Sequence, residues 1–570
     1  MVQRPDDTPV FFRNNVAMNE IRRIILWLVF IFSLALLWDQ WEISHGRKPM
    51  FMPSPTKATQ TAPAAATSSD AATPPAVANN TAVPQPDNNS SNTIKSERVE
   101  ISTDVLKLTF DTQGGSLLRA ELLKHADILR PGQNVVLFDD SKERVYLGQT
   151  GLIGSTSSEA WPTHKSAMRF SGPTALKEGE DQLTFQFQSL DAGDVSLVKT
   201  YTLTRGSYVL KLQHDITNNS AAAISPQLYV QLVRDGNKLE GESAFYSTFT
   251  GPAVFTNEKK YQKVDFEDIE KGEADFEKQT SQGYVAMVQH YFASAWLLDD
   301  AQNRTNFARK IDTNLYAVGM VAPLASIGPG DKLSHTARLF AGPQEEKILE
   351  ATYVGLELVK DYGWLTILSK PLYWLLYELN RLINNWGWSI VALVVVLKAA
   401  FYWLNAQAYR SMGKMKAINP KIMEMRERLK DNPQQMQTEM MKIYREEKVN
   451  PLGGCLPILV QIPFFIALYW VLLSSVEMRN APWIGWISDL AAPDPWFILP
   501  VLMTVTSVFQ TWLNPTPPDP IQAKLMWFMP VAFGVMFFFF PAGLVLYWLT
   551  NNILSIAQQW MINKQLGLHK

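Results

Sequence analysis

The sequence predicts a multidomain membrane protein with three parts: an N-terminal signal-anchor helix, an exported all-β sandwich and an α-helical bundle of five membrane spans. Three observations support this architecture. An apolar run follows a pair of arginines near the N-terminus, a long middle section alternates apolar and polar residues, and the last third contains apolar stretches long enough to cross a bilayer. A chain of 570 residues is also too long for one hydrophobic core.

The composition agrees with this architecture. Hydrophobic residues make up 47% of the chain and charged residues only 19%. The 18 tryptophans and 29 phenylalanines are typical of membrane proteins whose aromatic side chains gather at the bilayer surface. The single cysteine, Cys455, excludes an internal disulfide bond.

The N-terminal region predicts an anchor followed by a tether. An arginine pair precedes the apolar run Ile24–Trp38, and no small-x-small cleavage site follows that run. We therefore expect an uncleaved signal anchor at residues 24–41, with residues 1–23 in the cytoplasm. Residues 42–96 are mostly Pro, Ala, Thr, Ser and Asn, so they hold too few large apolar side chains to fold and predict a disordered exported tether.

Residues 97–350 predict an exported β-sandwich. Apolar and polar residues alternate between turn signals at Val105–Phe110, Leu183–Phe187, Val195–Leu203 and Tyr208–His214. Five histidines of this region are scattered without metal-ligand spacing: His125, His164, His214, His290 and His335. No G-x-S-x-G motif or glycine-rich phosphate loop is present, so we expect a binding or scaffolding module with no catalytic residue, metal site or cofactor.

Residues 351–383 predict an amphipathic helix that lies in the outer membrane interface. The segment is aromatic and apolar, but charged residues recur along it. These charges disfavour a helix that crosses the whole membrane. Five leucines share one face: Leu368, Leu372, Leu375, Leu376 and Leu379. Pro371 is expected to break this helix or to start a new turn.

The last third predicts five membrane spans. Residues 405–449 carry ten basic and six acidic residues, which places this section in the cytoplasm. As one helix, Lys524–Trp560 would be about 55 Å long, against a hydrocarbon core of about 30 Å, so we expect two spans joined at Pro541-Ala-Gly543. The predicted order is span 384–404, cytoplasmic hairpin 405–450, span 451–475, exported loop 476–495, span 496–513, cytoplasmic loop 514–523, span 524–540, exported turn 541–543, span 544–561 and cytoplasmic tail 562–570.

The cytoplasmic section predicts an antiparallel helical hairpin. Asn419-Pro420 is typical of a helix start, and Asp431-Asn-Pro433 is typical of a turn. The two arms have apolar seams rich in methionine: Ile422, Met425 and Leu429, then Met436, Met440 and Ile443. Such a seam is either a receptor for varied apolar segments, because methionine adapts to irregular partners, or a plain solvated coil with a methionine core. The sequence favours neither.

Lys398 is the one residue that stands out in the predicted spans. A lysine well inside an apolar span costs about 2.5–3.5 kcal/mol, so it is rare without a function or a partner. The alternative is snorkelling, because only roughly 10 Å of helix separates Lys398 from the polar turn at Asn405 and a lysine stem covers much of that distance. Position alone leaves these two interpretations equal.

Several C-terminal motifs together resemble the YidC family of membrane protein insertases. They are Asn384-Asn-Trp-Gly-Trp-Ser389, the Lys398 span, Asn450-Pro-Leu-Gly-Gly-Cys-Leu-Pro457, Gln461-Ile-Pro463 and Phe540-Pro-Ala-Gly-Leu-Val-Leu-Tyr547. The anchor, tether and exported β-domain resemble the Gram-negative layout of that family. The resemblance covers nearly the whole chain.

The resemblance implies a hydrophilic groove that opens to the cytoplasm and to lipid and is closed on the outside. Lys398 takes the position where family members usually have arginine, and Val394 corresponds to a polar residue of well-studied relatives. A family tyrosine of the last span corresponds to Trp548. The implied path along which a client's apolar helix slides contains Ile462, Pro463, Met536, Tyr547 and Trp548.

The resemblance also implies a non-enzymatic function in the bacterial inner membrane, with both termini in the cytoplasm. Implied partners are nascent membrane-protein chains, the Sec translocon with its accessory proteins, the lipid bilayer and, weakly through the cytoplasmic loops, the ribosome; no sequence-specific nucleic-acid binding is expected. A secondary transporter is disfavoured because no inverted repeat or acidic partner is found in the spans. An intramembrane protease lacks its residues, whereas a purely structural assembly factor stays open.

Overall fold

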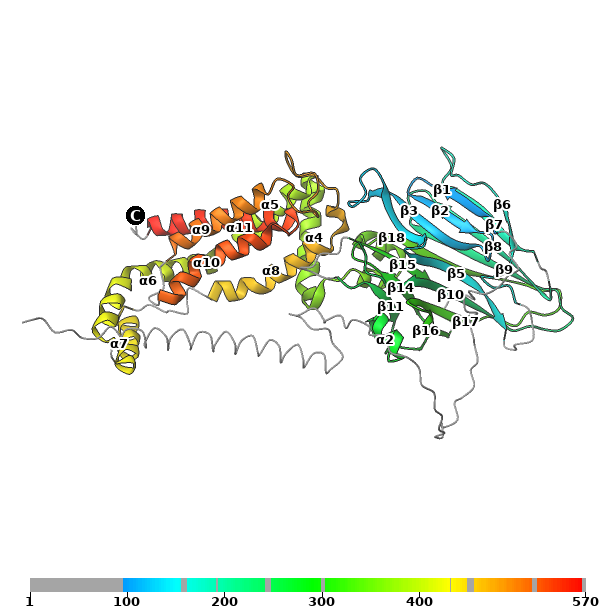
Figure 1. Cartoon of the computed structure of the whole chain (residues 1–570), viewed down its shortest axis with the longest axis horizontal. Coiled ribbons are helices and arrows are strands. Elements are labelled where there is room, and N and C mark those ends of the chain that lie inside the picture. Colours follow the sequence, from blue (N-terminus) through cyan, green and yellow to red (C-terminus); the bar gives the residue numbers. More distant parts are fainter. Residues whose placement is uncertain are drawn as a thin grey trace, which may run out of the picture. The chain divides into compact units, whose positions relative to one another are not determined.

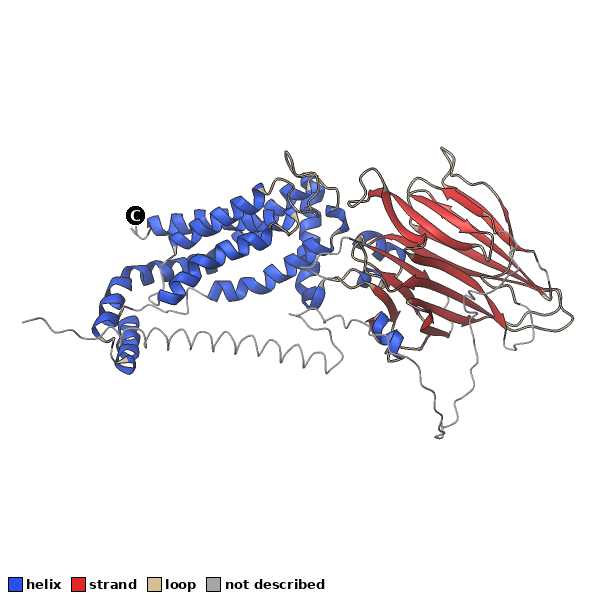
Figure 2. Cartoon of the chain, viewed as in Figure 1, coloured by secondary structure: helices blue, strands red, loops and turns tan. Residues whose placement is uncertain are grey.

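The computed structural model describes residues 96–154, 161–190, 193–240, 248–298, 303–430, 432–447, 456–514 and 520–565. The expected signal anchor and nearly all of the tether lie outside these residues, as do the end of the expected tail and the motif at 450–455. In the described part of the chain, the strands occupy residues 98–343 and, apart from short α2 (Phe266–Lys271), the helices follow them (Figures 1 and 2).

The β-region contains two nine-stranded sheets, and neighbouring strands in both run antiparallel. The first sheet has the order β1 (Arg98–Ser102), β2 (Leu106–Asp111), β3 (Ser116–Ala126), β4 (Asn134–Asp140), β5 (Val145–Gly154), β10 (Pro226–Asp235), β17 (Leu315–Pro323), β16 (Arg304–Asp312) and β13 (Gln279–Thr280). The second has the order β12 (Lys260–Lys263), β11 (Gly251–Thr256), β14 (Gly283–Val288), β15 (Phe292–Leu297), β18 (Lys332–Pro343), β9 (Val209–Asn218), β8 (Val195–Thr204), β7 (Gln182–Ser189) and β6 (Met168–Ser171).

The two sheets share one apolar core, so the predicted all-β architecture is confirmed. Exposed and buried residues alternate along the whole of β7, as period-two patterning requires. Strands of both sheets contribute buried side chains to a single cluster. Across it, the indole nitrogen of Trp296 on β15 donates a hydrogen bond to the backbone oxygen of Gln231 on β10 at 3.0 Å.

Several polar groups inside the sandwich hydrogen-bond the backbone or one another. Lys199 on β8 is fully buried, and its Nζ donates to the carbonyl oxygens of Gly114 at 2.6 Å and Thr150 at 2.8 Å. Burial lowers the pKa of Lys199 to about 7. His214 Nε2 lies 3.0 Å from the Thr150 hydroxyl. Among the described residues, no group of three or more His, Cys, Asp or Glu side chains is arranged to hold a metal ion.

The connector contains α3 (Glu346–Thr352), the 3₁₀ turns η1 (Leu356–Val359) and η2 (Gly363–Leu365), and α4 (Thr366–Ile383). The expectation that Pro371 breaks this helix or starts a new turn is wrong, because α4 runs through it. The carbonyl four residues earlier, which loses its hydrogen-bond donor, belongs to Ile367. Ile367 itself is 88% exposed.

Helices α5 (Trp386–Ala400) and α6 (Tyr402–Arg428) meet at a bend of 69°, and α7 (Pro433–Glu446) follows. The expected helix start at Asn419-Pro420 is wrong, because α6 continues through Pro420. Buried residues on both sides of that proline join one apolar seam with α7, and this shared packing keeps the helix continuous. The turn does use an Asn-Pro pair, since Asn432 caps α7 by accepting from the Gln435 amide at 3.2 Å.

The remaining helices are α8 (Leu456–Ser474), η3 (Val476–Met478), α9 (Ile498–Leu513), α10 (Pro520–Phe537) and α11 (Ala542–Gln565). Helix α11 packs against α5 and α9, whereas α4 packs against α5 and α8. A second apolar cluster, built from α4, α5, α8, α9, α10 and α11, forms the core of this helical part. The expected helical C-terminal region is thereby confirmed.

Within the described residues, no single helix is both long enough and apolar enough to cross a membrane alone. The bent pair Trp386–Ala400 and Tyr402–Arg428 is long and apolar enough when the two helices are taken together. Shorter apolar helices are Val460–Ser474, Ile498–Leu513 and Ile521–Phe537.

Candidate functional site

The motif before Lys398 fixes the start of α5. Asn384 adopts a left-handed backbone conformation that ends α4, with φ of +56°, which asparagine tolerates well. Asn385 then caps α5, because its side-chain oxygen accepts from the Trp388 amide at 3.0 Å. A Cβ added to Gly387 would lie 2.2 Å from Cδ1 of Trp483, so only glycine allows this close approach. The motif therefore places α5 against the loop that joins η3 to α9.

Lys398 lies three residues before the bend that ends α5, and its side chain crosses to α11. Lys398 Nζ donates a hydrogen bond to the Ser555 hydroxyl at 2.7 Å. None of the sequences of α5, α8, α9, α10 and α11 contains Asp or Glu. Among the described residues, no carboxylate forms an ion pair with Lys398. The positive charge is therefore held by a neutral partner.

A cavity of about 20 Å³ adjoins Lys398. Three helices and the bend after α5 line it, with apolar and polar side chains mixed: Val394, Leu397 and Lys398 of α5, Phe401 at the bend, Gln461 and Phe464 of α8, and Tyr547 and Asn551 of α11. This volume holds about one water molecule. A lysine beside two amides is suited to binding an anionic or polar group, and the cavity offers no nucleophile–base pair.

The second half of α11 is polar, and the sequence analysis missed it. Asn552 Nδ2 donates to the Ser507 hydroxyl of α9 at 2.7 Å, and Gln558 Nε2 donates to the Tyr402 carbonyl at 3.2 Å. Gln559 Nε2 donates to Asn514 Oδ1 at 3.0 Å. The signal was present in Thr550-Asn-Asn552 and the following Ser555, Gln558 and Gln559, which are too many polar residues for a lipid-facing helix.

Trp548 lies between α8 and α10, the two helices that carry Ile462, Pro463 and Met536 of the implied client path. Its ring centroid is 4.5 Å from that of Phe465 on α8, in an edge-to-face arrangement, and 5.1 Å from that of Phe537 on α10. Tyr547 stacks on Phe465 with centroids 6.1 Å apart and lines the Lys398 cavity. The residues around Trp548 thus connect the Lys398 cavity to both α8 and α10.

The other residues of the implied client path, Ile462, Pro463 and Met536, do not line the cavity. Ile462 on α8 is 43% exposed, and Pro463 lies inside the same helix. Met536 on α10 is half-buried and packs at the margin of the apolar core. The structure therefore brings Lys398 and Tyr547 into one cavity, with Trp548 behind it, and leaves the other three on the flanking helices.

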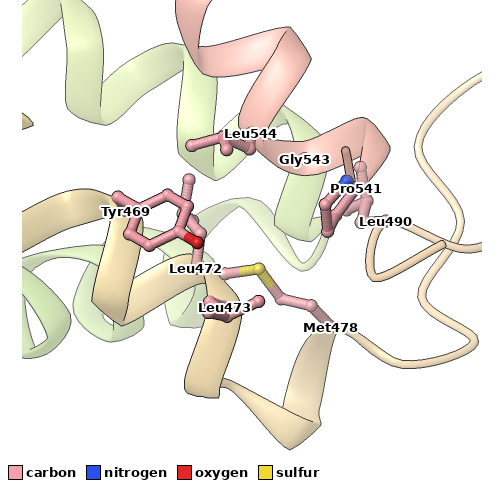
Figure 3. Close-up of a pocket in the computed structure, with 8 residues that line it drawn as sticks. All are labelled: Tyr469, Leu472, Leu473, Met478, Leu490, Pro541, Gly543 and Leu544. Carbon is pink, nitrogen blue, oxygen red and sulfur yellow. The ribbon is translucent and has the colours of Figure 1, made fainter. Parts of the chain in front are cut away.

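Backbone hydrogen bonds close the end of the helical part where α11 begins. The amides of Ala542 and Gly543 donate to the carbonyls of Ala492 at 2.8 Å and Leu490 at 2.9 Å. A Cβ on Gly543 would lie 3.1 Å from the Leu490 oxygen, which explains the glycine. A cavity of about 10 Å³ lies at this contact. Figure 3 shows the residues that line it, including Tyr469, Leu490 and Leu544. These hydrogen bonds hold the start of α11 against the loop that precedes α9.

Comparisons with known proteins match both parts of the chain. The family described as the YidC periplasmic domain matches residues 98–375, and the family described as 60Kd inner membrane protein matches residues 378–568. The membrane protein insertase YidC of Ralstonia nicotianae is 54% identical over 97% of this chain and 99% of its own length. The protein of the same name from Janthinobacterium sp. is 52% identical over 96% of this chain and 100% of its own length.

A solved structure also aligns with most of the chain. It is an active YidC insertase with its first transmembrane domain resolved, is 19% identical, and aligns with 81% of this chain and 92% of its own length at a TM-score of 0.37. The two family matches and the full-length relatives above 50% identity agree with each other. The chain belongs to the YidC family of membrane protein insertases.

Proposed function

We propose that this membrane protein insertase uses the Lys398 cavity as the place where a polar segment of a client chain begins to cross the bilayer. The observation that carries the proposal is the Lys398–Ser555 hydrogen bond in a cavity whose helices contain no acidic residue. A buried ion pair would neutralise the lysine. A neutral partner leaves its positive charge available for an acidic client segment.

The proposed topology places this charge within reach of the cytoplasm. An N-terminal anchor and five spans (384–404, 451–475, 496–513, 524–540 and 544–561) cross the inner membrane, and both termini lie in the cytoplasm. The outer contact of Gly543 with Leu490 supports closure on the exported side. The polar inner half of α11 supports water entry from the cytoplasm.

The proposed step is a transient electrostatic attraction followed by sliding, with no covalent chemistry and no cofactor. Two opposite charges 4 Å apart attract by about 1 kcal/mol in water and by about 4 kcal/mol at an effective dielectric constant of 20. This is enough to retain an acidic segment briefly and weak enough to release it. Water in the cavity shortens the apolar distance that the segment must then cross.

The client's apolar helix is proposed to leave toward lipid along α8 and α10. Ile462, Pro463, Met536, Tyr547 and Trp548 form this path. The exposure of Ile462 and the position of Trp548 between Phe465 and Phe537 support it. An apolar surface without directional hydrogen bonds suits clients of many sequences.

The partners of this function are proposed from the same geometry and family. Clients are nascent membrane-protein chains, received alone or with the Sec translocon and its accessory proteins, and the α6–α7 hairpin supplies a weak ribosome contact. Met423 on α6 and Met441 on α7 are about half exposed, which supports contact with varied apolar segments.

The proposal is tested by replacing Lys398 in a strain depleted of its own insertase. Lys398→Ala and Lys398→Glu are expected to reduce insertion of translocon-independent clients with acidic tails, whereas Lys398→Arg retains it because the charge is kept. Lys564→Ala is the matched control, since Lys564 lies near the end of α11 over the Trp560 ring and outside the cavity. Unchanged insertion of acidic-tailed clients by Lys398→Ala and Lys398→Glu would refute the proposal.

A further inference from the structure

Ser555 combines a fixed hydroxyl orientation with near-complete burial. It is 2% exposed and lies on α11. Its single hydroxyl proton is donated to the Asn551 carbonyl, one turn earlier, at 2.7 Å. The oxygen lone pairs therefore point away from α11, and one of them accepts from Lys398 Nζ at 2.7 Å. The Tyr409 side chain of α6 also hydrogen-bonds Ser555.

The lysine is held level with the cavity rather than turned to the cytoplasmic end. In the described part of the chain, Ser555 is the side-chain acceptor that hydrogen-bonds Lys398. A lysine ammonium has three N–H donors, so this bond leaves two for other acceptors. The adjoining cavity includes the side chains of Gln461 and Asn551. The contact thus opposes snorkelling and keeps the remaining donors beside the cavity.

We infer that Ser555 is a positioning residue that holds the Lys398 ammonium at the cavity and thereby sets the preference of this site for acidic client segments. The inference rests on the proposed function of Lys398 and adds a second residue to it. Ser555 acts through the lysine and does not itself select a charge. Without the hydroxyl, the flexible lysine stem is free to move its charge toward the cytoplasm.

The same helix offers a matched structural control. Asn552 is 3% exposed and donates to Ser507 of α9 at 2.7 Å, whereas Ser555, three residues later on the same helix, contacts Lys398 of α5. Replacing Asn552 by alanine removes a buried hydrogen bond of similar length without touching Lys398. A purely structural effect of α11 is therefore expected from Asn552→Ala and from Ser555→Ala alike, whereas a charge-selective effect is expected from Ser555→Ala alone.

The experiment uses the full chain in a depletion strain and two clients that differ only in tail residues, Asp in one and Asn in the other. Ser555→Ala is expected to lower insertion of the Asp client about threefold relative to the Asn client, the size of effect that one hydrogen bond produces. Ser555→Thr retains the hydroxyl and is expected to restore the preference. Asn552→Ala is expected to change both clients by the same factor.

A double substitution separates the positioning role from the proposed function. The quantity compared is the ratio of Asp-client to Asn-client insertion. If Ser555 acts through Lys398, this ratio is the same in Lys398→Ala/Ser555→Ala as in Lys398→Ala alone. Equal loss of both clients in Ser555→Ala, or full additivity with Lys398→Ala, would overturn the inference while leaving the function of Lys398 intact. If Lys398→Ala keeps the natural chain's preference for the Asp client over the Asn client, the proposed function fails, and the inference fails with it.

Discussion

Lys360 Nζ lies 3.3 Å from Oε1 of Glu477, with the lysine side chain fully buried and the glutamate side chain 10% exposed. The Tyr373 hydroxyl of α4 donates to the same carboxylate oxygen at 2.5 Å, and Lys360 Nζ lies 4.1 Å from the Tyr373 ring centroid. This ion pair ties the connector and α4 to the segment that follows α8. It is a structural contact, in contrast to the neutral hydrogen bond of Lys398.

Breaking this pair should destabilise the protein strongly. Glu477→Gln leaves the Lys360 charge buried without its counter-ion, and the expected loss is about 3–5 kcal/mol. The measurement is the thermal unfolding midpoint of the full chain in detergent. Glu378→Gln is the control, because Glu378 pairs with an exposed arginine, Arg381, and should cost at most about 1 kcal/mol. Equal shifts for the two variants would contradict this account of Glu477.

Stability of the β-sandwich should rise with pH between 7 and about 9.5 because of Lys199. Burial lowers its pKa from 10.5 to about 7, so in this window the unfolded chain binds a proton that the folded chain does not. The full shift from 10.5 to about 7 corresponds to about 5 kcal/mol. Above pH 10 the slope should reverse, since burial raises the pKa of tyrosines such as Tyr146 to about 12.

Unfolding of the full chain, followed by the far-ultraviolet strand signal at several pH values, measures this effect. Lys199→Met is expected to flatten the slope between pH 7 and 9.5. Lys211→Met on the neighbouring strand β9 is the control, because Lys211 is exposed. A slope that persists unchanged in Lys199→Met would show that another group titrates in this window.

Gly387→Ala should weaken the contact between α5 and the loop that joins η3 to α9. The added Cβ would lie 2.2 Å from Cδ1 of Trp483 and 2.6 Å from its Cβ, so the tryptophan must move. We expect a net loss of about 1–3 kcal/mol, as overpacked sites show, despite the better helix propensity of alanine. Gly193→Ala is the control, with open space around its Cβ, and should leave the unfolding midpoint unchanged.

Trp548→Ala should loosen α8 relative to α10. The substitution removes two aromatic contacts, each worth about 0.5–1.5 kcal/mol beyond buried area. Spin labels at the exposed positions Ile462 and Met529 report the distance between the two helices. The distance distribution is expected to broaden in Trp548→Ala and to stay narrow in Trp548→Phe; an unchanged distribution in the alanine variant would refute the bridging role of Trp548.

Local patterns in the sequence predicted the fold classes well. Alternation along β7 and β8 depends on adjacent residues alone, so these strands were predictable without knowledge of their neighbours. The order of strands in each sheet was not, because β10 pairs with β5 and β17 across long stretches of chain. Pro371 and Pro420 were misread because tertiary packing maintains a helix that the local signal would end.

The candidate site was predictable only in part, for the same reason. Lys398 stands out from the apolar residues around it, and that contrast is local. Its partner Ser555 is 157 residues away and becomes recognisable only when α5 and α11 pack together. The cavity depends on the relative positions of three helices, which spacing along one chain does not define.

The most direct test of the central claim is a charge reversal at Lys398. Insertion of two clients that differ only in tail charge, one acidic and one basic, is compared between the natural chain and Lys398→Glu in a depletion strain. The account predicts that the natural chain prefers the acidic client and that Lys398→Glu shifts the preference toward the basic one. An unchanged preference in Lys398→Glu would contradict the claim that the charge in this cavity attracts the client.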